Sequence, residues 1–279
     1  YWKMLQKIID TKVPLFVIVH TICETHRPFI SFGVGENYSY KFKEAINSNQ
    51  IECNYKYINE ELKFYNEIIP NNAFFSDDTI LTMAIAEAVQ TDMNYEEHLK
   101  KYGKLYRNYK PDIKPYFNGS FSPGFLKWCD ADERGTSIGN GAMMRISPIG
   151  FSFDNEIDVK KNARLATVPS HDSKEAIVYS TLIALIIFYA KNKVPKDEIL
   201  KKLNIKLKCE SFKKFNTTCS QTFDNCVWSA FNSNSFEESI KKILSFGGDT
   251  DTNACIVGSI AEALYGIDES LIVKAKQYI

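Results

Sequence analysis

Residues 173–191 read SKEAIVYSTLIALIIFYAK, and this stretch decides the fold class. It is strongly apolar and 19 residues long, as expected of a buried helix. Charged residues flank it, and Tyr179 and Ser180 lie within it. A helix in a protein core therefore fits this stretch better than a membrane span.

Helical periodicity continues on both sides of this segment. The spacing predicts further helices over 78–90, 95–109, a segment opened by Pro195, 236–246, 250–265 and 269–279. No Asn-Gly hairpin signal lies between two alternating segments. We therefore predict an all-α protein, folded as a single domain over residues 1–279. The stretches 30–55, 111–154 and 206–234 are expected to be long functional loops.

Composition excludes several classes of protein. The 279 residues are 44% hydrophobic with a formal net charge of zero, so the chain is globular and not disordered. Without excess basic charge, nucleic acid and membrane surfaces are not expected partners. The apolar run 13–19 is too short to span a bilayer and is expected in the core. The seven cysteines show no CxxC spacing, which indicates thiols in a reducing compartment and a cytoplasmic location.

Two acidic clusters precede predicted helices. The first is Ser76-Asp77-Asp78-Thr79, and the second is the segment GGDTDTN over 247–253. Helix capping explains one or two such residues per helix, but not adjacent carboxylates or an Asp-x-Asp-Thr after paired glycines. If the two helix starts meet, four carboxylates converge and repel one another. Hard divalent cations would relieve that repulsion, and an all-oxygen ligand set suits Mg²⁺ or Mn²⁺.

Two further features are weaker when taken alone. Gly139-Asn140-Gly141 lets the backbone approach a ligand closely and can direct N–H groups at a phosphate, although a tight turn before a helix is the simpler interpretation. His171 precedes the long apolar helix, where a histidine is more often a structural group than a catalyst.

The four segments FSDDTILTMAIAEAV, TSIGNGAMMRISPIG, PSHDSKEAI and FGGDTDTNACIVGSIAEALYG, in this order, resemble the ADP-ribosylglycohydrolase family. Its members include ADP-ribosylarginine and ADP-ribosylserine hydrolases and the dinitrogenase reductase-activating glycohydrolase. The resemblance covers roughly residues 74–279. It implies an all-α orthogonal helical bundle with two Mg²⁺ (or Mn²⁺) ions in a cleft.

The resemblance also assigns roles to individual positions. The implied metal ligands are Ser76, Asp77, Asp78, Asp249, Asp251 and Thr252, with Ser76 standing where the family usually has Thr. The implied ADP-ribose contacts are Ser137, Gly139, Asn140, Gly141, Ala142 and His171. Asp77 or Asp78 could accept a proton from the attacking water.

The N-terminal part, residues 1–73, diverges from the family pattern. Members typically open with Gly-Asp-x-x-Gly followed by an acidic residue, whereas this chain has FGVGENY over 32–38. Glu36 is therefore the candidate for the acidic residue that assists catalysis or closes over the substrate.

The implied activity is a metal-dependent hydrolase that removes ADP-ribose from a modified side chain or small molecule by cleaving the glycosidic bond at C1″. Its partners would be an ADP-ribosylated protein or an ADP-ribose-containing small molecule, and we expect a monomer or a weak dimer. Two alternatives remain open: an inactive relative that binds ADP-ribose or serves a structural role, as crystallin-like members do, and a hydrolase of another nucleotide-like substrate. The linkage that is cut also remains open.

Overall fold

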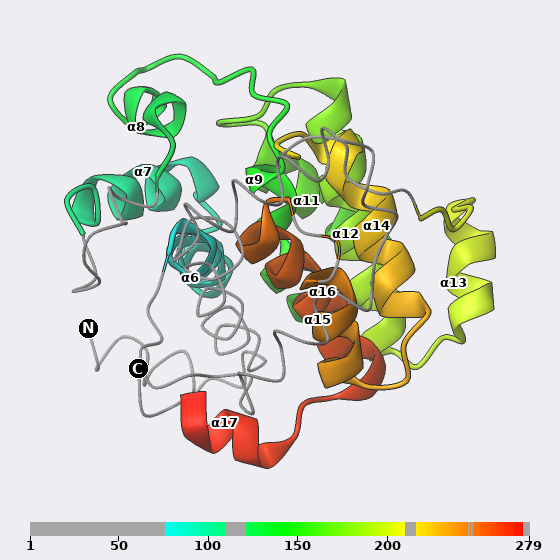
Figure 1. The fold of residues 1–279 in the computed structure, drawn as a ribbon. Helices are drawn as coiled ribbons and strands as arrows, with labels where there is room; N and C mark the ends of the chain where they lie inside the picture. The colour runs from blue at the N-terminus through cyan, green and yellow to red at the C-terminus, as the bar shows by residue number, and fades with distance from the viewer. Residues whose placement is uncertain (1–75, 110–120, 210–215, 245, 247, 276–279) are drawn as a thin grey trace, which may run out of the picture.

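The computed structural model describes residues 76–109, 121–209, 216–244, 246 and 248–275. Over these residues the chain is all-α, and its only β-type contacts are two isolated bridges. The helices follow one another as shown in Figure 1. They are α6 (Asp77–Gln90), α7 (Tyr95–Leu105), α8 (Pro123–Cys129), α9 (Gly141–Met144), α10 (Ser147–Ser152), α11 (Glu156–Thr167), α12 (Lys174–Lys191), α13 (Lys196–Leu203), α14 (Cys219–Phe231), α15 (Phe236–Leu244), α16 (Thr250–Tyr265) and α17 (Glu269–Ala275).

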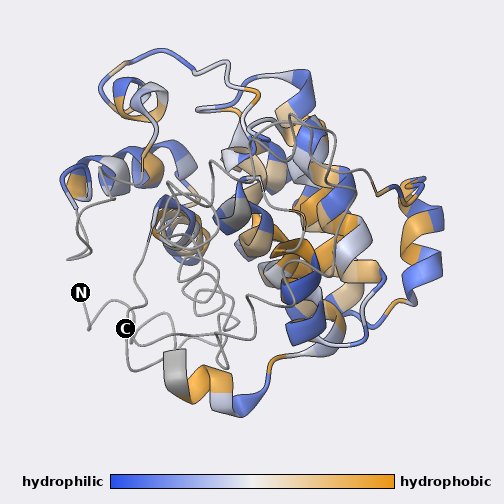
Figure 2. Ribbon diagram, viewed as in Figure 1, coloured by the Kyte–Doolittle hydropathy of each residue, from blue (hydrophilic) through white to orange (hydrophobic). Residues whose placement is uncertain are grey.

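Helix α12 is the centre of the described fold. It packs against α9, α10, α11, α14 and α16, and its residues from Ile183 to Ile187 are at most 2% exposed. Figure 2 shows apolar residues gathered where the central helices meet, whereas α7 at the edge is largely hydrophilic. Burial of this apolar surface is the main force that assembles the bundle.

Gly150 allows α10 to lie directly against α12. A Cβ built at this position would lie 2.6 Å from the backbone oxygen of Ala184 and 2.7 Å from Cβ of Ile187. Only a residue without a side chain fits such an approach. Helix α9, which precedes α10, also packs against α12.

The structure confirms the all-α class and each predicted helix that lies in the described part of the chain. Helix α7 ends at Leu105, four residues before the predicted limit of 109, and α17 is described as far as Ala275. The apolar run 13–19 and the loop 30–55 lie outside the described residues. No helix in the described ranges is long and apolar enough to cross a membrane.

Two predicted loops are wrong, because both contain helices. The stretch 111–154 holds α8, α9 and α10, and 206–234 holds α14; α11 was also not predicted. The α14 sequence CSQTFDNCVWSAF has low intrinsic helix propensity. Its helix is fixed by a capping box between Thr218 and Gln221 and by a buried face that includes Phe223 and Val227.

Candidate active site

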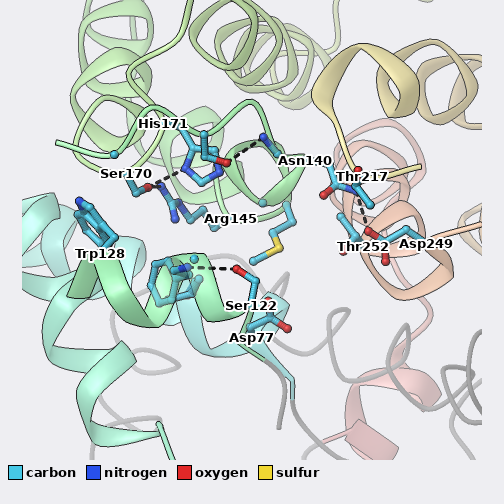
Figure 3. A pocket seen from close by; sticks show the side chains of 18 of the residues that line it. Asp77, Ser122, Trp128, Asn140, Arg145, Ser170, His171, Thr217, Asp249 and Thr252 are labelled. Carbon is cyan, nitrogen blue, oxygen red and sulfur yellow. Dashed lines mark hydrogen bonds between the residues drawn. The ribbon is translucent and has the colours of Figure 1, made fainter. Parts of the chain in front are cut away.

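A cavity of about 580 Å³ opens where several helix ends converge. Its wall includes the first residue of α6, the start of α16, the Gly139–Gly141 segment before α9, and residues between α11 and α12. Figure 3 places Asp249 and Thr252 on one side and Trp128, Arg145 and Ser170 on the other. The cavity therefore joins segments that are far apart in the sequence.

The acidic side brings together carboxylates from the two predicted clusters. Asp77, Asp249 and Asp251 all line the cavity. Burial raises the pKa of Asp249 well above its usual value, and the neighbouring charges of Asp251 and, to a smaller extent, Asp78 raise it further. Because Asp78 lies on α6 and the other two at the start of α16, the carboxylates of both helix starts are close enough to repel each other.

Helix capping explains part of the first acidic cluster, the one that begins with Ser76. It does not explain the presence of Asp249. The Ser76 hydroxyl accepts a hydrogen bond from the Asp78 amide at 3.3 Å and donates one to Asp78 Oδ2 at 3.1 Å, as an N-cap residue does. Asp249 occupies the N-cap position of α16, but its side chain makes no capping hydrogen bond. The Asp249 carboxylate instead faces Asn140 across the cavity wall.

A network of amide side chains holds Asp249. Asn140 Nδ2 donates to Asp249 Oδ2 at 2.7 Å, and the Asp249 amide donates to Asn216 Oδ1 at 2.9 Å. Asn216 Nδ2 in turn donates to Asn253 Oδ1 at 2.7 Å and to Thr222 Oγ1 at 2.8 Å. The network links the glycine segment, α14 and α16.

Sequence reasoning missed Asn216, Thr222 and Asn253 as site residues. Asn253 lies inside the GGDTDTN segment, and its position one residue after Thr252 was the available signal. Asn216 and Thr222 lie in a stretch predicted to be a loop, where no motif marks them. Asn140 was predicted to contact ADP-ribose, and the structure gives its amide a second task, the orientation of Asp249.

Most N–H groups of the glycine segment donate hydrogen bonds within the protein. The Gly139 amide donates to Ser137 Oγ at 3.0 Å, the Asn140 amide to Thr217 O at 2.9 Å, and the Ala142 amide to Gly139 O at 3.4 Å. Of this segment's amides, the Gly141 N–H alone is left without an acceptor among the described residues. The sequence suggested that several successive N–H groups could bind a phosphate. In the structure, fewer of these N–H groups are available to a ligand.

The predicted site residues divide into three groups. Those that line the cavity are Asp77, Ser137, Gly139, Asn140, Gly141, His171, Asp249, Asp251 and Thr252. Ser76, Asp78 and Ala142 are buried behind this wall. Glu36 lies outside the described residues.

Aromatic side chains form the part of the cavity wall opposite Asp249, where Figure 3 labels Trp128. The rings of Phe121 and Phe125 stack at 5.4 Å, and Phe125 meets Trp128 at 5.5 Å. Phe121 and Trp128 are buried in the core, whereas Phe125 is partly exposed and lines the cavity with Trp128. The cluster thus serves core packing, and Phe125 offers an aromatic surface to a ligand.

Burial changes the protonation behaviour of His171. Its side chain lines the cavity and is 7% exposed. Burial, and secondarily the charge of Arg145, lower the pKa of His171 well below its ordinary value. The imidazole is therefore neutral at physiological pH and can act as a hydrogen-bond donor or acceptor without carrying charge.

The acidic side has the donor chemistry of a hard-cation site. The polar side-chain atoms it offers are oxygens from carboxylates and a hydroxyl, the kind of donor that suits Mg²⁺ or Mn²⁺. In the described part of the chain, no three His, Cys, Asp or Glu side chains form a ready-made metal centre. The pKa of Asp249 is raised first by burial and then by the charges of Asp251 and Asp78, and a bound cation would favour the ionised carboxylates against both effects.

Comparison with known proteins identifies relatives. The model of the ADP-ribosylglycohydrolase family matches residues 34–272. The chain is 24% identical over 267 residues to ADP-ribosylhydrolase ARH3 from Danio rerio, with 70% of each chain covered. A solved structure of an ADP-ribosylglycohydrolase-related protein complex superposes with a TM-score of 0.58 at 19% identity, covering 75% of this chain and 81% of that one. That likeness establishes the fold.

Proposed function

The chain belongs to the ADP-ribosylglycohydrolase family, and from this premise we propose that it is a metal-dependent hydrolase that removes ADP-ribose from a modified side chain or small molecule. The bond we assign is the glycosidic bond at C1″. Membership of the family supports the hydrolase class. We infer the metal requirement from the carboxylates of the cavity, and we infer the bond from the resemblance to the family.

The observation that carries the proposal is the set of groups that line one cavity. Carboxylates from the starts of α6 and α16 meet there with an imidazole, a glycine segment and aromatic rings. ADP-ribose has matching groups, since its distal ribose carries hydroxyls, its centre carries two phosphates and its adenine is aromatic. We therefore orient the distal ribose toward Asp77, Asp249 and Asp251.

Ser76, Asp77, Asp78, Asp249, Asp251 and Thr252 would hold two Mg²⁺ or Mn²⁺ ions. Such ions, when bound, supply Lewis acidity toward ribose hydroxyls and a water molecule. Asn140 fixes one oxygen of Asp249 and so sets the direction of the carboxylate's other oxygen. Asp77, which is less buried than Asp78, is the better placed of the two to accept a proton from a water in the cavity.

The direct test is replacement of the carboxylates on α16. We expect Asp249→Asn and Asp251→Asn each to lose divalent-cation binding in calorimetry and release of ADP-ribose from a panel of arginine-linked, serine-linked and acetylated substrates. Asp197→Asn, an exposed carboxylate at the start of α13, is the matched control and should retain both. Full turnover by either site variant would rule out the metal role.

The same assay separates the hydrolase from a protein that only binds ADP-ribose. The sequence FGVGENY at 32–38, which departs from the family's opening motif, is the feature that raises this second possibility. Wild-type protein that binds ADP-ribose tightly with Mg²⁺ present, yet turns over no substrate in the panel, would establish binding in place of hydrolysis.

A further inference from the structure

A short relay of hydrogen bonds runs along the cavity wall to His171. Arg145 Nη2 is 2.6 Å from Ser170 Oγ, and Ser170 Oγ is 2.7 Å from His171 Nδ1. The three side chains are 1%, 4% and 7% exposed, so water competes little for these contacts. Figure 3 shows them together on one side of the cavity. Arg145 follows α9, whereas Ser170 and His171 lie between α11 and α12.

Hydrogen-bonding chemistry fixes the first step of this relay and favours one direction for the second. A guanidinium group only donates, so Ser170 Oγ accepts from Arg145. The Ser170 hydroxyl has one proton, and His171 Nδ1 is the acceptor the structure places within reach of it. If Nδ1 instead carried the proton and donated to the second lone pair of Ser170 Oγ, the buried Ser170 proton would have no acceptor among the described contacts, which is costly. The favoured arrangement is therefore the one in which Nδ1 accepts and is unprotonated. A neutral imidazole with an unprotonated Nδ1 carries its proton on Nε2.

The charge of Arg145 works in the same direction. Burial lowers the pKa of Arg145 to about 10, which still leaves the guanidinium protonated at neutral pH. A cation held close to the ring disfavours a second positive charge on His171. Arg145 also donates to Ala166 O at 3.4 Å, which anchors it to the end of α11.

The free edge of the ring points at the glycine segment. A Cβ built at Gly139 would lie 3.6 Å from His171 Nε2, and one built at Gly141 would lie 3.8 Å from it. Both glycines and His171 line the cavity. A proton on Nε2 would therefore lie in the cavity close to the N–H group of Gly141. Both groups could donate to the same part of a ligand.

We propose that Arg145 and Ser170 are positioning residues that hold His171 neutral with its proton on Nε2, so that the ring donates a hydrogen bond to an acceptor oxygen of the ligand. Neither Arg145 nor Ser170 needs to touch the ligand for this role. The proposed protonation state is argued from the contacts of Arg145 and Ser170 and does not depend on the proposed function. The identity of the acceptor, a phosphate or ribose oxygen of ADP-ribose, rests on the proposed function.

Nitrogen NMR of the full chain tests the relay without substrate. The sequence has only four histidines, so ¹⁵N-histidine labelling gives a simple long-range ¹H–¹⁵N spectrum, and His171→Gln identifies the signals of His171. We expect Nδ1 of His171 to resonate as an unprotonated nitrogen and Nε2 as a protonated one. Ser170→Ala should shift His171 to a mixture of tautomers, and Ser170→Thr should restore the wild-type pattern.

Ser180→Ala is the matched control, since Ser180 is fully buried and bonded to Thr167 but does not contact the imidazole. It should leave the His171 signals unchanged. A wild-type spectrum with Nδ1 protonated, or with both nitrogens protonated, would overturn the proposal even if Ser170→Ala does not fold. An unchanged tautomer in folded Ser170→Ala would overturn it as well.

Calorimetry with ADP-ribose then separates this inference from the proposed function. We expect Ser170→Ala to bind ADP-ribose about tenfold more weakly than wild type, equivalent to about 1.4 kcal/mol, with Ser180→Ala unchanged. Unchanged affinity in Ser170→Ala would overturn the ligand-facing part of the proposal. A wild-type protein that does not bind ADP-ribose would contradict the proposed function while the NMR result still decides the relay.

Discussion

Asn140 is the residue that connects the two sides of the cavity. It belongs to the glycine segment, yet its amide donates to Asp249 at 2.7 Å and lies 3.4 Å from Thr222 Oγ1. A side chain that orients a metal-binding carboxylate affects metal affinity without touching the metal. Asn140 therefore couples the expected phosphate contacts to the expected cation site.

Replacing Asn140 tests this coupling. We expect Asn140→Ala to weaken Mn²⁺ binding by about 10- to 100-fold, as is typical when the hydrogen-bond partner of a metal ligand is removed. Isothermal titration calorimetry measures the affinity. Asn232→Ala, which removes an exposed amide at the end of α14, should bind Mn²⁺ like the wild type. Wild-type affinity in Asn140→Ala would contradict the coupling.

At the scale of elements, Gly150 decides how α10 meets α12. We expect Gly150→Ala to destabilise the protein by about 1–3 kcal/mol, because the added methyl group would overlap Ala184 and Ile187. Urea unfolding monitored by circular dichroism gives the free energy of unfolding. Gly124→Ala is the matched control, since nothing lies within 4 Å of a Cβ built there. Equal midpoints for the two variants would show that α10 does not pack as described.

Helix α16 carries a carboxyl group, that of Glu262, whose deprotonation destabilises the folded chain. Burial raises the pKa of Glu262 from 4.5 to about 8, so the folded chain keeps a proton that the unfolded chain releases between these values. The free energy of unfolding therefore falls as pH rises from about 4.5 to 8, by at most about 1.4 kcal/mol per pH unit from this group.

Glu262→Gln removes this titration. We expect the variant to match the wild type near pH 4.5 and to be more stable than it at pH 8 and above, measured as the urea midpoint across the pH range. Glu269→Gln, a substitution at an exposed site on α17, controls for the loss of one negative charge. A constant difference between Glu262→Gln and wild type at all pH values would contradict the raised pKa.

The sequence predicted elements well wherever a long apolar segment contained no helix breaker. Helices α6, α12 and α16 have nearly the predicted limits, and most of their residues are buried in continuous runs, as in helices that are covered on all sides. Helix α14 was missed because Ser, Thr, Asn and Cys dilute its pattern, and tertiary packing overrides its low propensity. The capping box of Thr218 and Gln221 was the local signal that could have revealed it.

The candidate site was predictable in its parts and not in its connections. The clusters around Asp77 and Asp249 stand out because adjacent carboxylates exceed what capping needs, and the structure places both on one cavity. The buried amides that hold Asp249 come from segments with no motif, and the role of Asn216 depends on a contact 33 residues away in sequence. Such contacts depend on tertiary packing, which cannot be read from the local pattern of a single sequence.

At the scale of the whole molecule, the bundle acts as a frame that brings helix starts to one cavity. The first residue of α6, the start of α16 and the segment before α9 all open onto it, and α12 packs against α9 and α16. The partial positive charge at a helix start stabilises anions there, which helps keep carboxylates ionised when a cation is present. The central claim is that the starts of α6 and α16 share bound divalent cations.

Anomalous diffraction from crystals grown with Mn²⁺ tests that claim most directly. The account predicts two anomalous peaks, with carboxylate oxygens from both α6 (Asp77 or Asp78) and α16 (Asp249, Asp251) within coordination distance. Peaks absent from this cavity at saturating Mn²⁺, or bound by carboxylates of one helix alone, would contradict it.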